Sequence, residues 1–414
     1  MRPFGPIGMI TFSRRPADTP SEEAARLLLR IGVFMLFVIA LSAPIVARQT
    51  VYILLPVGAA LLLAAAALSN NGGSLRLLLQ SSAVWAALLL LVWTGVSLIW
   101  TPFEGPAERF AKAAGTMALV AAAAGLMPAR TKTSNLNLLP IGVGVAVVAL
   151  VAVTQFLSPT YTAEDVLDVG PLGRAGLGLA LLVWPAMGAL AVRGRWIWAA
   201  SLGAATIVAC GLANAPNALP ALFGGALVFV AAFGRPQLIS IWLAAVMAAI
   251  VLLAPLAALA AHALWSGHAP DFFKYLALWG HVIAFDGLRT LLGHGFGAAT
   301  WGVLGGYLPA ATPRSLVFQI WFDLGVVGAA ALALVLARAS LEVGAARPAL
   351  APFLLGGLGA AFVICLLGPA AEQLWWLTLA GLDAIAFALV MRGQFRKRRP
   401  VLPIGAGASA EDAA

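Results

Sequence analysis

One segment of the chain, residues 265–315, gathers side chains that can bind an anion. It carries three cations and three histidines, which are Lys274, Arg289, Arg314, His268, His281 and His294. Arginine presents a planar, permanently charged fork that matches two oxygens of a phosphate, whereas lysine adds a point charge. Any one of these residues alone is more often a solvated loop residue. The group together predicts recognition of an anionic group.

Arg174 is a further candidate, because it opens an apolar stretch directly after the acidic residues Glu164, Asp165 and Asp168. Two interpretations of this arginine remain open. Its guanidinium either reaches the membrane interface and pairs with one of the carboxylates, or it clamps a phosphate.

Two of the histidines, His294 and His281, are candidates for proton transfer. His294 lies in the segment Gly293–Gly297, where alternate glycines permit a tight turn of the backbone. His281 follows Trp279 by two positions. Either imidazole can act as a general base near neutral pH. The alternative, a histidine that is merely hydrogen-bonded to the backbone, stays equally open for both.

The other polar residues give no pattern for a metal ion, so no metal or other cofactor is expected. Four histidines and two dispersed cysteines do not reach the spacing of metal ligands. Glu104, Glu108 and Arg109 are expected to form an ion pair at the end of an apolar stretch. Asp323 and Asp383 fall inside such stretches and must face the protein interior or a wet cavity.

The composition indicates the class of protein in which these residues lie. Of 414 residues, 62% are hydrophobic and 10% are charged, and the mean hydropathy is +0.97. Soluble proteins carry roughly 45–50% apolar and about 25% charged residues. The net charge of +9 does not indicate a nucleic-acid partner, since the cations stand in short clusters between apolar stretches. The sequence therefore predicts an integral membrane protein.

The predicted fold is all-α and polytopic, with about twelve transmembrane helices. A helix spans a bilayer with about 20 apolar residues, and the runs lack the alternation of a β-barrel. We expect spans near residues 27–47, 50–68, 77–100, 109–127, 138–157, 174–192, 196–214, 217–233, 238–264, 316–337, 349–368 and 373–391.

The positive charges predict the orientation of these spans. With the N-terminus in the cytoplasm, inner segments hold 18 of the 25 lysines and arginines, so the positive-inside rule predicts that both termini are cytoplasmic. The first span is expected to be retained, because no cleavage site follows it. The predicted parts are a cytoplasmic segment 1–26, spans 1–9 in 27–264, a periplasmic loop 265–315, spans 10–12 in 316–391, and a basic cytoplasmic tail 392–414.

The outer loop between spans 9 and 10 contains an amphipathic stretch from Asp271 to Leu292. Its apolar residues are spaced for one helical face; they are Phe272, Leu276, Trp279, Ile283 and Leu291. A loop of about 50 residues with its own helix is usually functional rather than connective. We therefore expect the chemistry here.

Residues 312–328, which read Thr-Pro-Arg-Ser-Leu-Val-Phe-Gln-Ile-Trp-Phe-Asp-Leu-Gly-Val-Val-Gly, resemble the signature of the O-antigen ligase and polysaccharide polymerase superfamily. The stretch from Lys274 to Gly297 resembles the loop helix and glycine-rich turn of that family. Residues 173–185 resemble its central span that opens with arginine, and residues 100–104 its third-span exit. The twelve expected spans and the large outer loop agree with this resemblance.

The resemblance implies an enzyme of the bacterial cytoplasmic (inner) membrane that needs no cofactor. It would pass a glycan from undecaprenyl diphosphate to a sugar hydroxyl, on lipid A core or on another growing glycan, at the periplasmic face. Apolar grooves between the spans would hold the prenyl tail, among membrane lipids. The residues expected to bind the diphosphate are Arg174, Lys274, Arg289 and Arg314.

The catalytic residues expected from the resemblance are Arg314, His294 and His281, but Arg314 is a departure. The family has a histidine where this chain has Arg314, and an arginine stays protonated and cannot act as a general base. Three explanations remain open. Another histidine substitutes, Arg314 acts only electrostatically on the leaving diphosphate, or the chain is a divergent and inactive relative.

Two other classes of function stay open. A lipid or solute transporter predicts repeats or broken helices in matched halves of the chain, and no convincing similarity between halves is visible. A non-catalytic partner in a polysaccharide assembly complex is compatible with the missing histidine.

Overall fold

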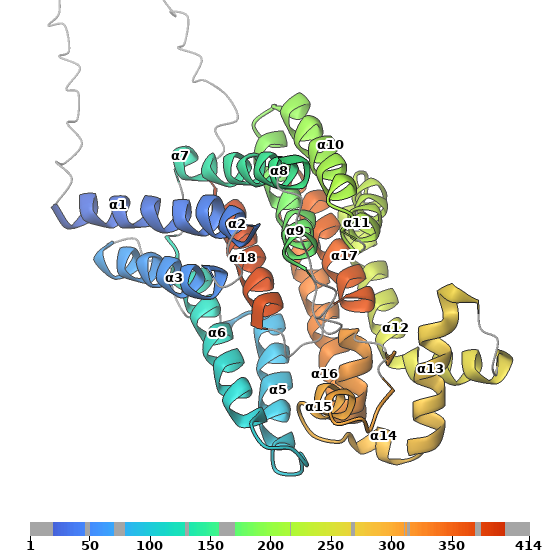
Figure 1. The fold of residues 1–414 in the computed structure, drawn as a ribbon. Coiled ribbons are helices and arrows are strands. Elements are labelled where there is room, and N and C mark those ends of the chain that lie inside the picture. The colour runs from blue at the N-terminus through green and yellow to red at the C-terminus, as the bar shows by residue number, and fades with distance from the viewer. Residues whose placement is uncertain are drawn as a thin grey trace, which may run out of the picture.

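The computed structural model describes most of the chain, and the described residues form helices joined by turns (Figure 1). This confirms the predicted all-helical class. The described residues are 20–45, 50–69, 79–128, 132–156, 170–215, 217–265, 270–309, 311–312, 315–368 and 374–393.

The elements of the first half begin with an irregular helix. They are α1 (Pro20–Phe34), the π-helix η1 (Met35–Ile39), α2 (Ala40–Ser42), the 3₁₀-helix η2 (Ala43–Ile45), α3 (Thr50–Leu68), α5 (Ser82–Ser97), α6 (Pro106–Leu126), α7 (Thr133–Leu136), α8 (Leu138–Phe156), α9 (Pro171–Ala191) and α10 (Trp196–Leu212).

The second half contains the three helices of the expected outer loop. Its elements are α11 (Ala218–Ala232), α12 (Pro236–Leu264), α13 (Asp271–Asp286), α14 (Arg289–Leu292), α15 (Ala298–Leu304), α16 (Leu316–Gly344), α17 (Ala351–Leu367) and α18 (Leu374–Met391).

The described part of each expected span is mainly helical, and several helices suit a bilayer. Among the described residues, five helices are both long and apolar enough to cross a membrane: Pro20–Ser42, Thr133–Phe156, Pro171–Ala191, Pro236–Leu264 and Leu316–Gly344. Shorter apolar helices account for most of the other expected spans. The fold is therefore consistent with a helical membrane protein, and the number of twelve crossings stays a prediction.

Several helix boundaries differ from the sequence-based expectation, among them the end of α16 at Gly344 rather than at residue 337. The first helix begins at Pro20, before the expected start at residue 27. The amphipathic helix α13 ends at Asp286 rather than Leu292, because Gly287 has φ 58° and ψ −128°, a conformation that residues with a side chain avoid. The chain then turns and forms the short helix α14.

Several helix ends that were expected on the cytoplasmic side contact one another. Arg392, just after α18, donates through Nη1 to the carbonyl of Met127 and through Nη2 to the carbonyl of Gly125 at 3.1 Å, at the end of α6. Arg193, after α9, donates to Oδ1 of Asn137 before α8. Burial is the main cause that lowers the pKa of both guanidinium groups. These ends therefore lie together at one end of the bundle.

Two more contacts join helix ends that were also expected on the cytoplasmic side. The carboxylate of Glu342, near the end of α16, accepts from the hydroxyl of Ser81 at 2.7 Å and from that of Ser82 at 3.0 Å, at the start of α5. Nη1 of Arg347 donates to the carbonyl of Gly393 at 3.1 Å. These contacts join helix ends that were expected on one side, and the topology itself stays a prediction.

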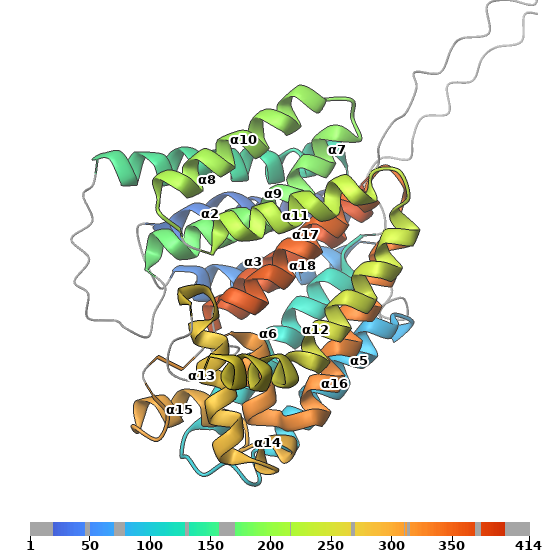
Figure 2. The same ribbon diagram turned by 90° about the vertical axis from the view of Figure 1, so that its right-hand side faces the viewer.

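The helices arranged in Figures 1 and 2 pack around two large apolar cores, and a small third cluster includes Phe353. The larger core surrounds α9, whose residues from Arg174 to Pro185 are all buried, between α8, α10, α17 and α18. The second core joins α16 to α12 and to the outer helices α13 and α15. Figure 2 shows α13, α14 and α15 close together at one end of α12 and α16. The residues of the expected loop therefore pack on the second core.

Glycines allow close approach where helices cross, as is common for helices packed in membranes. A Cβ atom on Gly142 of α8 would overlap the carbonyl of Phe37, and one on Gly280 of α13 would overlap the carbonyl of Ala258 in α12. In both cases the obstacle is backbone, which cannot rotate away.

We predict that Gly280→Leu lowers the stability of the purified protein by about 1–3 kcal/mol, since overpacking against backbone has this cost. Gly115→Leu is the matched control, because a Cβ on exposed Gly115 of α6 meets nothing within 4 Å. Thermal unfolding in detergent, followed by tryptophan fluorescence, measures both. Equal midpoints for the two variants would contradict the close α12–α13 packing.

Candidate functional site

Helix α16 is interrupted at Gly325, which has φ 65° and ψ −158°. Carbonyl groups just before such a break need donors from elsewhere, because a lipid environment supplies none. The backbone N–H of His294 donates to the carbonyl of Phe322 at 2.9 Å, and that of Gly295 donates to the carbonyl of Asp323 at 2.8 Å. These bonds join the outer segment to the middle of a long apolar helix.

A third bond comes from another helix. Nε1 of Trp93 in α5 donates to the carbonyl of Leu324 at 2.9 Å. Donors from two different parts of the chain therefore satisfy the carbonyls before the break.

The segment Gly293–Gly297, which we call the glycine turn, lies directly against this break. Its three glycines have positive φ angles of 79°, 94° and 89°. A Cβ at Gly293 would lie 2.5 Å from the carbonyl oxygen of Asp323, and one at Gly295 would lie 2.6 Å from Cα of Thr101. Only glycine fits these positions, which explains the Gly-x-Gly-x-Gly spacing.

The end of α5 holds the same turn from the other side. Phe296 donates its backbone N–H to Oγ of Ser97 at 3.1 Å, and its carbonyl accepts from Oγ1 of Thr101 at 3.1 Å. Ser97 is fully buried. The turn is therefore bound to α5 as well as to α16.

Asp323 is the buried carboxylate at the centre of this arrangement. Asp323 is 2% exposed. This agrees with the expectation for an acid inside an apolar stretch. Oδ2 accepts from the N–H of Gly297 at 3.0 Å, and Oδ1 accepts from the N–H of Ala299 at 2.7 Å. The carboxylate thus satisfies two donors at the start of α15.

His294 is held between protein groups. Its Nδ1 lies 3.0 Å from the carbonyl oxygen of Phe322, and its Nε2 lies 3.2 Å from Oδ2 of Asp286. The ring stacks on Phe322 with centroids 4.2 Å apart and planes 9° apart. Both ring nitrogens therefore face oxygen atoms of the protein. The geometry matches the hydrogen-bonded interpretation, and the catalytic role stays a prediction.

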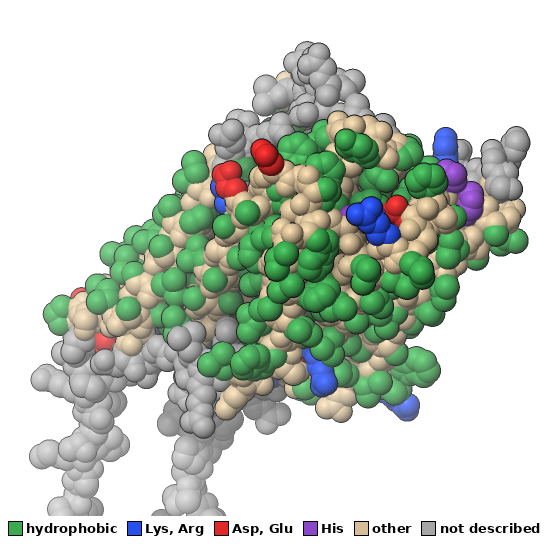
Figure 3. Space-filling model, turned by 90° about the horizontal axis from the view of Figure 1, so that it is seen from below, with side chains coloured by type: hydrophobic (Ala, Val, Ile, Leu, Met, Phe, Trp, Pro, Cys, Tyr) green, Lys and Arg blue, Asp and Glu red, His purple; other side chains and the backbone are tan. Residues whose placement is uncertain are grey.

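His281 lies in a different place. It is exposed on α13, and its ring centroid is 5.2 Å from that of His262 on α12. In the face shown in Figure 3, histidine side chains gather at the edge near a basic side chain, and the other charges stand in small separate groups on a mainly apolar surface. The two expected catalytic histidines thus have different surroundings.

The expected diphosphate-binding cations divide between two parts of the bundle. Arg174 is 7% exposed in the first turn of α9, with its guanidinium 5.2 Å from the ring centroid of Trp375 in α18. Lys274 on α13 and Arg289 on α14 are exposed, and these helices pack on α12 and α16. Arg314, like His268, lies outside the described residues, as do the acidic residues before Arg174.

A cavity of about 160 Å³ lies between α5, α6, α16 and α18. Its walls are mainly apolar, and its polar lining residues are Thr94, Gln319 and Asp323. Phe296 of the glycine turn also lines it. The helix break and the turn therefore form one end of a largely apolar cavity.

Two lining residues connect the cavity with expected cations. Trp376 lines the cavity and follows Trp375, the residue against which the Arg174 guanidinium lies. Leu316 also lines it and follows Arg314 by two positions in the sequence. Arg174 contacts the residue next to a lining residue, and none of Arg174, Lys274 and Arg289 is itself among the residues that line the cavity.

Sequence reasoning missed an aromatic surface beside the glycine turn. Phe103 stacks on Trp301 with centroids 6.3 Å apart, and it also lies 6.3 Å from Tyr307, which is 80% exposed. The guanidinium of Arg109 lies 5.0 Å from the Trp301 ring centroid. We call Phe103, Trp301 and Tyr307 the aromatic platform. Its members are far apart in the sequence, so no local pattern marks it.

The expected ion pair after the third apolar stretch has different partners. Glu108 pairs with Lys112 at 2.5 Å, one helical turn away, and both side chains are largely exposed. The pair lowers the pKa of Glu108, through the hydrogen bond and the charge of Lys112. The charge of Arg109 also lowers the pKa of Glu108, as the smallest of the causes, and the Arg109 guanidinium lies over Trp301.

No family model, no curated protein and no solved structure matches this chain. The resemblance to the O-antigen ligase and polysaccharide polymerase superfamily therefore rests on the residues quoted above.

We predict that Asp323→Ala destabilises the glycine turn, because it leaves the N–H groups of Gly297 and Ala299 unsatisfied at about 1–3 kcal/mol each. Hydrogen exchange of residues 293–299 should become faster by at least tenfold. Asp323→Asn should retain part of the protection, since one acceptor oxygen remains. The control is Glu108→Gln at an exposed position, and unchanged exchange in Asp323→Ala would contradict the proposed contacts.

Proposed function

We propose that this protein transfers a glycan from undecaprenyl diphosphate to a sugar hydroxyl at the outer face of the bacterial cytoplasmic membrane. One observation carries the proposal. The two segments with the most specific family resemblance, the glycine turn and residues 315–328, contact each other at the break in α16, and both contribute to one apolar cavity. A lipid-linked donor needs an apolar groove next to polar groups, and this is such a place.

The protein would bind two chemically different parts of the donor, the apolar prenyl chain and the anionic diphosphate. The apolar lining from α5, α6 and α18 suits part of a prenyl chain. Arg174 of α9, which lies against Trp375 of α18, would bind the diphosphate together with Arg314. Lys274 and Arg289 are exposed on α13 and α14, so in this proposal they steer the anionic donor from a distance.

The reaction is a displacement at the anomeric carbon of the donor sugar. The acceptor hydroxyl oxygen forms the new bond to that carbon, the bond from carbon to the diphosphate oxygen breaks, and the hydroxyl proton is released. Negative charge develops on the leaving diphosphate, and a fixed guanidinium stabilises it there more than in the bound donor. Arg174, buried and held against Trp375, is pre-organised for this role.

The aromatic platform supports a place for the acceptor glycan. The C–H faces of sugars stack on aromatic rings, and Tyr307 and Trp301 lie beside the glycine turn with Arg109 over Trp301. The acceptor is lipid A core or another glycan in this proposal, which includes cooperation with other polysaccharide assembly proteins.

The broken helix α16 is also a feature of transporters, in which freed carbonyls coordinate ions. Here the carbonyls of Phe322, Asp323 and Leu324 already accept hydrogen bonds from His294, Gly295 and Trp93. They are occupied by protein donors, which favours glycan transfer over transport.

Arg174→Ala should lower transfer at least about 100-fold, since removal of one group that stabilises a developing anion has this effect. Arg174→Lys should give an intermediate rate. The lysine ammonium keeps the positive charge but cannot bind two phosphate oxygens with the geometry of a guanidinium. Surface polysaccharide in cells and transfer in liposomes with a polyprenyl-diphosphate donor measure the effect.

The control for this experiment is Arg338→Ala, an exposed cation near the other end of α16. Protein amount and thermal unfolding must match among the variants. Full activity of Arg174→Ala would refute the assigned role, and the absence of transfer by the wild-type protein under all conditions would favour the non-catalytic alternative.

A second prediction concerns His294, for which we expect a positioning role because both ring nitrogens are engaged. His294→Gln should keep transfer within about tenfold of wild type with the same pH profile, whereas loss of a general base costs about 10²–10⁴-fold. Asp286→Asn is the matched variant that removes the partner of Nε2. A loss above 100-fold with an altered pH profile would instead assign proton transfer to His294.

A further inference from the structure

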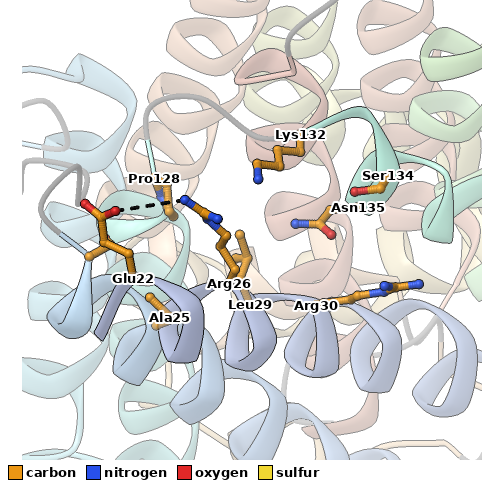
Figure 4. Close-up of a pocket in the computed structure, with 11 residues that line it drawn as sticks. Glu22, Ala25, Arg26, Leu29, Arg30, Pro128, Lys132, Ser134 and Asn135 are labelled. Atoms are coloured by element: carbon orange, nitrogen blue, oxygen red, sulfur yellow. Dashed lines mark ion pairs between the residues drawn. The ribbon is translucent and has the colours of Figure 1, made fainter. Parts of the chain in front are cut away.

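A second cavity, of about 360 Å³, lies far along the sequence from the proposed transfer site, between α1, the end of α3 and the segment around α7 (Figure 4). Helix α1 contributes Glu22, Ala25, Arg26 and Leu29, whose spacing places them on one helical face. The lining adds Arg30 from the same helix and, from other segments, Lys132, Ser134 and Asn135.

The charge of this lining is mainly positive. It contains Arg26, Arg30 and Lys132 but one carboxylate, Glu22. The carboxylate lies 3.9 Å from Nη2 of Arg26, and both side chains remain partly exposed. This pair is long and solvated, so Glu22 does not neutralise the site.

The cations approach the cavity from opposite walls. Figure 4 shows the side chains of Arg26 on α1 and Lys132 before α7 directed toward each other, with the amide of Asn135 to one side of them and its nitrogen directed toward Arg26. Asn135 is 6% exposed, and its side-chain amide makes no hydrogen bond within the described part of the chain. A buried amide donor that points into a basic cavity is suited to an anionic oxygen.

The floor of the cavity is apolar, and so is the outer face of the same helix. Leu29 and Ala65 are buried beneath the polar groups. On the other face of α1, Leu27 and Ile31 are 60% and 40% exposed. The site therefore lies where a polar pocket meets a surface suited to acyl chains.

We propose that this cavity binds a phosphate group, and that its source is the headgroup of an anionic phospholipid. Arg26 and Lys132 hold the phosphate oxygens from two sides, and the Asn135 amide donates to a third position. Basic pockets between membrane helices on the cytoplasmic side are a common form of anionic-lipid site. The proposal is independent of glycan transfer.

The test uses the purified full-length protein in detergent, titrated separately with phosphatidylglycerol, phosphatidylcholine and inorganic phosphate. A ligand that binds the folded state raises the thermal midpoint in a concentration-dependent way. We expect phosphatidylglycerol to raise it, phosphatidylcholine to have little effect, and the rise to weaken with salt.

Lys132→Gln should raise the apparent Kd for phosphatidylglycerol about tenfold, since a charge-assisted hydrogen bond is lost. Asn135→Leu tests the buried amide, and Arg195→Gln is the control, because Arg195 is an exposed cation outside this cavity. Lys132 is exposed, so its replacement should leave the fold intact.

The outcomes separate the two sources of phosphate. A rise with inorganic phosphate that Lys132→Gln weakens supports the site and assigns it to soluble phosphates instead of lipid. If Lys132→Gln and Asn135→Leu respond to both probes as Arg195→Gln does, the proposal is overturned.

Discussion

The structure depends on how the chain satisfies the backbone carbonyls that the break at Gly325 exposes inside an apolar bundle. Water is scarce there, and an unpaired carbonyl is expensive. The glycine turn brings the N–H groups of His294 and Gly295 to the break, and Trp93 adds the indole donor from α5. In return, the Asp323 carboxylate satisfies the start of α15. Each partner therefore stabilises the fold of the other.

Much of the helical fold was predictable, because most of the described helices consist largely of apolar residues. The break in α16 was not, since Gly325 stands in an apolar run and glycines are common in such runs. The same holds for the end of α13 at Gly287. The backbone at Gly325 packs so closely on the carbonyl of Leu291 that no Cβ would fit, whereas a Cβ at Gly287 would meet nothing within 4 Å.

The site was predictable in its parts but not in its arrangement. A carboxylate inside an apolar stretch had to be buried, and Asp323 is. Its partners, however, lie in a segment far away in the sequence. Arg174 lies over Trp375, a contact that sequence spacing does not reveal. The basic cavity was not predicted, because Arg26 and Lys132 were used only to orient the spans in the membrane. Cations of this kind can also lie together and bind a ligand.

The attachment of the glycine turn to both α5 and α16 has a consequence for access. Ser97 and Thr101 bind the backbone of Phe296 from one side while the α16 break binds its neighbours from the other. Because the glycine turn is hydrogen-bonded on both sides, it cannot move away from the cavity as a hinged lid. In the proposed function, a prenyl chain would then have to reach the cavity from the side of α5 and α6, whose residues line it.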